Sequence, residues 1–434
     1  MSAAMPGGDT VPGRHTVVVT GLGVVTSLGA GREANWAALM EGRSGIRRIT
    51  RFPVENLRTT IAGTVDFLPE SGAPAPDLTE ALARLAAEEA LAGAGLGRGG
   101  RQAPASGGDF PGPLFLAMPP VEMEWSTRFA LGVETGHPAD CSYDDLVAAA
   151  WHQKALIGRY LFGSIGQNLA DRFGTRGAPI ALSTACASGA TAIQLAAEAI
   201  RRGEAEAALA IGADGSVTPE AVIRFSLLSA LTARNEPPAE AARPFSKGRD
   251  GFVMAEGAGA LVLESLEHAR ARGAAILGVV SGCGEMADVF HRTRSSPDGH
   301  AIIGAMRNAL ADAGLGPADI GYINAHGTGT PENDKMESLG VLAVFGEQAP
   351  PISSNKSMIG HTLSAAGAVE AVFTLETMRR GMLPPTINVR EPDPTIPLDI
   401  VPNHPRPATV RHAMSNSFGF GGQNVCLVFS AGPG

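Results

Sequence analysis

Charged residues are scarce in this sequence, and their scarcity limits the possible partners. They make up 18% of the 434 residues, and the formal net charge is -9 at pH 7. Nucleic-acid-binding proteins need basic residues clustered on one face, so we expect no nucleic-acid partner. No apolar run approaches the roughly 18 residues of a membrane-spanning helix. The sequence therefore predicts a soluble, cytoplasmic protein without a membrane span.

Cysteine is rare as well. Cys141, Cys186, Cys283 and Cys426 lie far apart and form no CxxC pair. This spacing fits reduced thiols in a cytosolic protein better than a disulfide framework or a zinc site. Any special role for one of these cysteines must therefore come from its local chemistry.

The usual nucleotide and metal signatures are missing. The segment 415–424 (SNSFGFGGQN) lacks the lysine of a Walker A loop, and the GLG at 21–23 lacks the third glycine of a dinucleotide fingerprint. Asp334 and Glu337 are near His326, but no HxxxH or HExxH spacing accompanies them. We expect neither a bound nucleotide nor a metal.

What the sequence does contain is a layered α/β pattern. A chain of 434 residues exceeds the size of one ordinary core, so we expect two units. Short apolar runs predict strands, and alanine-rich stretches predict helices. Strands are expected at 16–20, 179–183, 207–211, 259–263, 275–280 and 320–324, with helices at 188–201, 300–313 and 363–379.

The chain divides into a lead-in and two halves. Residues 1–14 are predicted to be a disordered lead-in, 15–271 the N-terminal half and 272–434 the C-terminal half. Each half has one small-residue helix that follows a Ser/Thr-rich strand end, and we expect it to be buried. The stretch 97–113 is rich in Gly, Pro and Ser, and the wider region 97–162 is interpreted as a partly inserted, irregular and mobile surface region.

Cys186 lies in the motif STACASG (183–189), between a strand end and the first turn of a helix. A helix N-terminus favours thiolate over thiol, and its free N–H groups can hold an oxyanion. The motif therefore suits a nucleophile, although a buried structural cysteine is an equally good explanation at this point.

Two histidines occupy similar strand-to-helix turns. His326 lies in NAHGTGT (324–330), and His361 ends SSNKSMIGH (353–361). Neutral imidazoles can donate N–H bonds to a thioester carbonyl and so stabilise an enolate without a metal. Lys356 is expected to pair with Glu337 and to hold His361 in place. The alternative for either histidine is a solvated or capping side chain.

With these residues in place, the sequence resembles the elongating β-ketoacyl-acyl-carrier-protein synthase family over almost its whole length. Three further motifs contribute to the resemblance: VTGLGVVTSLG (19–29), RPFSKGRDGF (243–252) and EGAG (256–259). The family implies a thiolase-like fold, in which two pseudo-symmetric halves form a five-layered αβαβα arrangement. It also implies a homodimer that needs no dissociable cofactor, because the departing carboxylate supplies the driving force.

The resemblance also implies roles for individual residues. Cys186 would accept the acyl chain, and the backbone N–H groups of Cys186 and Phe420 would form the oxyanion hole. His326 and His361 would help malonyl carrier protein to lose CO2, with Lys356 among the catalytic residues. Phe420 would gate the acyl pocket, with Phe418 and Glu337 in support; ordinary core packing is the larger share of Phe418's expected role. The partner would be acyl carrier protein in its acyl and malonyl forms.

Two departures from the family point to a specialised acyl chain or carrier. The region 77–90, where the family carries basic residues for the carrier protein, has Arg84 as its only cation. Arg224, Arg234, Lys247 and Arg249 are possible substitutes. The second departure is the elongated 97–162 region. The nearest resemblance is to condensing enzymes for very-long-chain fatty acids of rhizobial lipid A, so long or very long chains are expected.

Three alternatives remain open. The first is a polyketide-type ketosynthase with the same mechanism, and the second is a catalytically idle scaffold that binds carrier proteins. A thiolase is the third. Thiolases use a second cysteine as base, and initiating synthases pair their cysteine with His and Asn, whereas this sequence offers His326 and His361.

Overall fold

The computed structural model describes residues 15–96, 110–134 and 142–432. The predicted lead-in, 1–14, lies outside them. Ten strands follow one another across a single large sheet, in the order β6-β5-β7-β8-β1-β9-β15-β14-β10-β11. They span β1 Val17–Thr26, β5 Leu114–Ala117, β6 Ile180–Leu182, β7 Ala207–Asp214, β8 Gly257–Ser265, β9 Gly278–Ala287, β10 Tyr322–Asn324, β11 Ile352–Ser353, β14 His412–Phe418 and β15 Gln423–Ser430.

The sheet consists of the same arrangement made twice. In the first half, β6, β5 and β7 are parallel, and β8 and β1 continue antiparallel. In the second half, β11, β10 and β14 are parallel, and β15 and β9 continue antiparallel. The halves meet where β1 pairs with β9 at Val18–Val279 and Val19–Gly278. An internal repeat of one five-stranded unit therefore accounts for the topology.

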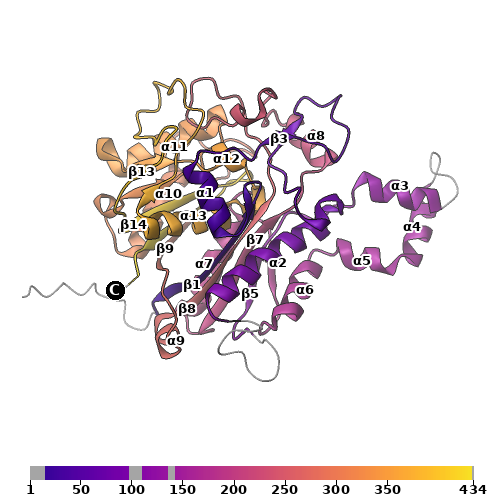
Figure 1. Ribbon diagram of the computed structural model, residues 1–434, viewed down its shortest axis with the longest axis horizontal. Helices are drawn as coiled ribbons and strands as arrows, with labels where there is room; N and C mark the ends of the chain where they lie inside the picture. Colours follow the sequence, from indigo (N-terminus) through magenta and orange to yellow (C-terminus); the bar gives the residue numbers. More distant parts are fainter. Residues whose placement is uncertain (1–14, 97–109, 135–141, 433–434) are drawn as a thin grey trace, which may run out of the picture.

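Helices form three layers around these strands (Figure 1). Helix α2 (Ala75–Gly93) and helix α6 (Ser164–Phe173) cover the outer face of the first half, while α10 (His300–Ala313) and α11 (Pro331–Phe345) cover that of the second. Between the halves lie α7 (Ser188–Arg201) and α13 (Ala366–Arg380). The five layers confirm the predicted thiolase-like fold.

The two central helices touch backbone to backbone. A Cβ atom added at Gly189 of α7 would lie 2.5 Å from the backbone nitrogen of Ala368, and one at Gly367 of α13 would lie 2.4 Å from that of Ala190. Only glycine permits this approach. Residues 366–377 of α13 are all buried, as predicted, although its first turn (Leu363–Ala365) is a 3-10 turn.

The prediction of irregular structure at 97–162 is wrong for most of its described residues, whereas the predicted surface position is confirmed for the helices of this region. Strand β5 is completely buried in the sheet between β6 and β7. Beyond it, α3 (Trp125–Glu134), α4 (Tyr143–His152) and α5 (Lys154–Tyr160) project from the body at the right of Figure 1. A four-residue strand beside a Gly/Pro-rich stretch gives too short a pattern to recognise. Residues 97–109 and 135–141 lie outside the described ranges.

Among the described residues, no helix is long and apolar enough to cross a membrane. Shorter elements make up the rest of the described structure. They are β2 Gly29–Ala30, α1 Arg32–Met40, β3 Arg47–Arg48, β4 Ile61–Ala62, α8 Pro219–Leu227, α9 Leu266–Ala271, α12 Lys356–Ile359, β12 Met382–Leu383 and β13 Arg406–Pro407, with 3-10 turns at Pro69–Gly72, Pro238–Glu240, Pro317–Asp319 and Gly346–Gln348.

Candidate active site

Cys186 lies in a tight turn between β6 and α7. Ala185, directly before it, has a φ of 49°, which is a left-handed conformation that a side chain adopts only under constraint. The Ser188 hydroxyl supplies that constraint, since it accepts from the Thr184 N–H at 2.7 Å and donates to the Ala185 carbonyl at 2.6 Å. The turn directs Cys186 into the interior, where the residue is 8% exposed.

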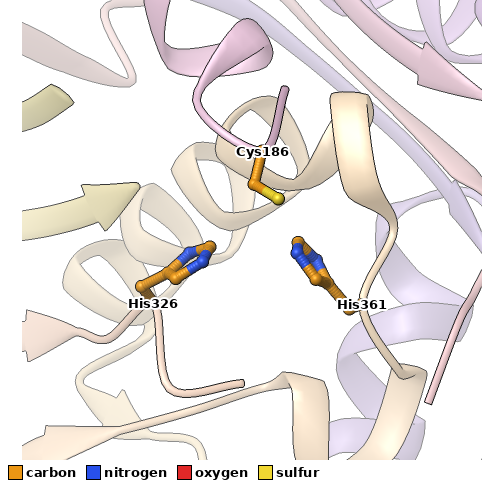
Figure 2. Close-up of side chains that lie close together, drawn as sticks. All are labelled: Cys186, His326 and His361. Carbon is orange, nitrogen blue, oxygen red and sulfur yellow. The ribbon is translucent and has the colours of Figure 1, made fainter. Parts of the chain in front are cut away.

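The turn brings Cys186 to the two predicted histidines. Figure 2 shows the three side chains pointing toward one another, and ligand-type atoms of all three lie within 4.8 Å of each other. His326 follows β10, and His361 follows α12. Their ring centroids are 5.3 Å apart at an interplanar angle of 85°. The two turns, 35 residues apart, therefore build one site.

The partners of the two imidazoles determine which nitrogen carries the proton. The backbone N–H of Leu363 donates to Nδ1 of His361 at 3.3 Å, and Nζ of Lys356 lies 3.5 Å from Nδ1 of His326. A backbone N–H and an ammonium can only donate, so both Nδ1 atoms accept. Each ring consequently carries its proton on Nε2, and Nε2 of His361 has no partner among the described residues.

Both histidines are neutral near pH 7. Burial lowers the pKa of His326 well below 6.5, and the charge of Lys356 and then His361 lowers it further. Burial and Lys356 do the same to His361. Two neutral N–H donors facing a thiol suit an oxyanion. A metal-binding histidine usually donates its second N–H to an acceptor, whereas here Nδ1 meets donors, which opposes metal binding through Nε2.

The predicted ion pair between Lys356 and Glu337 is wrong. Nζ of Lys356 instead forms a very short ion pair with Glu370 of α13, and both side chains are at most 2% exposed. Lys356 also contacts His326 rather than holding His361 through its side chain. Burial raises the pKa of Glu370 to about 7, although Lys356 opposes that rise. Glu370 was missed because an acid within an apolar helix gives no periodic signal. Its position in a helix expected to be buried was the clue.

Glu337 holds the loop that carries His326. Its carboxylate accepts from the N–H groups of His326 at 2.8 Å and Gly327 at 2.7 Å, and from Nδ2 of Asn416 at 3.1 Å. The side chain is completely buried, and this burial raises its pKa. Glu337 therefore holds the backbone of the loop in place, because buried donors need a partner within the protein.

The expectation of a stabilised thiolate at Cys186 does not hold for the free protein. Burial raises the pKa of the thiol to about 11, and a hydrogen bond from the Phe420 backbone and the charge of Lys356 lower it only in part. Desolvation therefore outweighs these two contributions, and the resting group is a neutral thiol.

Phe420 stands between two cavities. One, of about 320 Å³, includes Met118, Ile165 and Phe225 and reaches Cys186; the other, of about 420 Å³, contains His326 and His361. Cys186 and Phe420 line both. Phe418 is 6% exposed, and its ring centroid is 5.8 Å from that of His326.

The repeated fold and the Cys-His-His site together define a condensing enzyme of the thiolase-like class. Comparison with known families then narrows the class. The model described as "Beta-ketoacyl synthase, N-terminal domain" matches residues 14–98 and 127–269, and that of the "C-terminal domain" matches 277–390. The chain belongs to the β-ketoacyl synthase family.

Individual relatives extend over nearly the whole chain. It is 38% identical to 3-oxoacyl-[acyl-carrier-protein] synthase 2 of Vibrio harveyi, covering 96% of this chain and 98% of the relative. It is 35% identical to a putative polyketide beta-ketoacyl synthase 1 of Streptomyces cyaneus, covering 96% and 98%. Among solved structures, a beta-ketoacyl synthase from Burkholderia phymatum is similar with a TM-score of 0.81 at 35% identity, covering 96% and 100%.

Proposed function

We propose that this enzyme is a β-ketoacyl-acyl-carrier-protein synthase that elongates fatty acyl chains by decarboxylative condensation. The observation that carries the proposal is the convergence of the Cys186 sulfur with two histidines whose Nε2 atoms carry protons. The name of the Vibrio harveyi relative supports acyl carrier protein as the partner. A solved ketosynthase of a type II polyketide system, complexed with its acyl carrier protein and similar with a TM-score of 0.83 at 32% identity, supports the same partner.

In the first half-reaction, Cys186 takes the acyl chain. Its sulfur attacks the thioester carbonyl of acyl carrier protein, and the bond to the carrier sulfur breaks. The proton of the Cys186 thiol ends on the leaving carrier thiol, so no net proton is released. The backbone N–H groups of Cys186 and Phe420 hold the tetrahedral oxyanion. The cavity of about 320 Å³ receives the acyl chain.

In the second half-reaction, malonyl carrier protein enters the cavity that contains the histidines. Its carboxylate leaves as CO2, and Nε2–H of His326 and of His361 stabilise the enolate oxygen. The carbanion attacks the Cys186 thioester carbonyl, forming the carbon–carbon bond. Collapse of the tetrahedral intermediate releases the Cys186 thiolate, which then takes up one proton. Neutral histidines are essential because an imidazolium would be costly to keep in this buried site.

Several further properties belong to the same proposal. The enzyme acts as a cytoplasmic homodimer, with halves 15–271 and 272–434, and prefers long or very long chains. Thiols stay reduced in the cytosol, which supports the cytoplasmic location of an enzyme with a catalytic cysteine. A polyketide-type role, favoured by the Streptomyces cyaneus relative, is the second candidate.

The test is intact-protein mass after incubation with carrier proteins that bear acyl chains of different length. Wild type gains the acyl mass, Cys186→Ala gains none, and the extent of labelling ranks the chains. Cys283→Ala is the matched control, because it removes a thiol that does not line either cavity. Absence of an adduct with every donor would favour the idle scaffold. A preference for oxygenated chains over saturated ones would favour the polyketide role.

A further inference from the structure

The basic residues that the sequence offered for carrier docking are mostly engaged elsewhere. Arg84 on α2 lies 3.4 Å from Glu70 and 3.5 Å from Glu88. Three of the four candidate substitutes pair with carboxylates: Arg224 with Glu122 at 2.7 Å, Lys247 with Glu391 at 2.7 Å and Arg249 with Asp393 at 2.6 Å. The fourth, Arg234, is exposed but lines neither cavity, so a cation for the anionic arm of the carrier must be sought among other residues.

Two such cations lie at the cavity that contains the histidines. Arg292 and Arg294 line it, and both are exposed. Within the described ranges, neither guanidinium has a carboxylate at ion-pair distance. Two acids share the lining. Asp288 is 4% exposed and accepts from the backbone N–H groups of Phe290 and Ser296, while Glu332 is exposed. Two exposed arginines thus face one exposed acid, and the net charge of these three side chains at the cavity is positive.

The backbone that carries these arginines is fixed. The N–H of Gly421 donates to the Arg292 carbonyl at 2.8 Å, and the N–H of Asp288 donates to the Gly422 carbonyl at 2.7 Å. A Cβ atom on Gly422 would lie 1.8 Å from the Asp288 carbonyl oxygen. Segment 288–296 is thus bound to the loop of Phe420, while the guanidinium groups remain available.

We propose that Arg292 and Arg294 bind the phosphate ester of the pantetheine arm while its thioester reaches Cys186. The inference rests on the proposed function. Guanidinium groups suit phosphate because their N–H donors match its oxygens in pairs. The lining position favours the arm over the carrier's outer surface, because both cavities reach Cys186 and the proposed function assigns the other one, of about 320 Å³, to the acyl chain.

The phosphate could belong to a carrier protein or to coenzyme A, so the test compares four donors. These are acyl thioesters of pantetheine, phosphopantetheine, coenzyme A and carrier protein. We measure kcat/KM for acylation of Cys186 with wild type, Arg292→Ala/Arg294→Ala and the corresponding double Lys variant. Arg411→Ala is the matched control, because Arg411 is exposed and lines neither cavity.

Wild type should prefer phosphopantetheine to pantetheine on the order of tenfold to a hundredfold, since charged hydrogen bonds of this kind typically have such effects. The double Ala variant should reduce that preference to about one, the double Lys variant should retain part of it, and Arg411→Ala should retain all of it. In the double Ala variant, kcat/KM with acyl carrier protein should fall by the same factor as kcat/KM with acyl phosphopantetheine.

Three outcomes would overturn the proposal. An equal loss with pantetheine and phosphopantetheine would mean that the arginines only hold the loop. A fall in kcat/KM confined to the carrier-protein donor would mean that the arginines contact the carrier's surface. A fall confined to the coenzyme A donor would mean that they bind its nucleotide. Failure of the proposed function is distinguishable, because wild type would then form no acyl-Cys186 even from the phosphate-free thioester.

Discussion

Replacing Lys356 with methionine should separate the two half-reactions. Met keeps most of the length of the side chain but removes the cation that faces Nδ1 of His326 and pairs with Glu370. Without that donor, the His326 ring proton can move to Nδ1, and the Nε2–H toward the enolate is no longer enforced. Acylation of Cys186 relies on backbone N–H groups and should persist.

The expected magnitudes follow from these contacts. Loss of one preorganised donor typically costs about 10²–10³ in rate, so malonyl decarboxylation should fall by that factor. The rate of Cys186 acylation should stay within about threefold of that of wild type. The stability of the variant depends on Glu370. This carboxyl has a pKa of about 7 even beside Lys356, and without the cation its pKa rises further.

The pH dependence of the stability loss has a definite sign. Below about pH 7, Glu370 is protonated in both proteins, and the variant should lose only about 1–2 kcal/mol. Above that pH, Glu370 is ionised in folded wild type but remains protonated in the folded variant. The difference in unfolding free energy between the two proteins therefore grows by about 1.4 kcal/mol per pH unit, up to the pKa of Glu370 in the variant. Denaturant unfolding at pH 6 and pH 8.5 measures the difference.

The assays are release of labelled CO2 from malonyl carrier protein and intact mass for acylation. Lys335→Met, on exposed α11 surface, is the matched control. Lys356→Met/Glu370→Gln should recover stability at high pH but not decarboxylation. This result would separate the loss of the His326 tautomer from a general loss of folded structure. Decarboxylation within about threefold of wild type, or acylation reduced as strongly as decarboxylation, would refute the reasoning.

Three other predictions concern the same site. Because burial raises the pKa of Cys186 to about 11, its alkylation by iodoacetamide, followed by mass, should rise about tenfold per pH unit from pH 7 to 10; a plateau near pH 8 would mean that α7 prevails over burial. Glu337→Ala should cost about 3–6 kcal/mol in chemical denaturation, since three buried donors lose their acceptor, while Glu337→Gln should cost less; equal losses would contradict this account. Protonated Nε2 atoms should keep the site from competing with a chromophoric chelator for Zn2+ at pH 7, and submicromolar zinc binding that requires Cys186 would contradict the tautomers.

Most long elements of the fold were predictable from local pattern. Helices at 188–201 and 300–313 have the predicted bounds, because amphipathic or small-residue periodicity over 14 residues is a strong signal. Strand β5 was not predictable. Its four residues owe their strand conformation to the parallel neighbours β6 and β7, which no local pattern encodes.

The sequence by itself determined which groups could do chemistry, since Cys186, His326 and His361 each stand in a turn rich in small residues. Tertiary structure decided how these groups are charged and paired. Burial makes the thiol neutral, and Lys356 meets Glu370 of a buried helix instead of Glu337. The reason is physical: desolvation and ion pairing depend on what surrounds a group in space, and those neighbours come from distant parts of the chain.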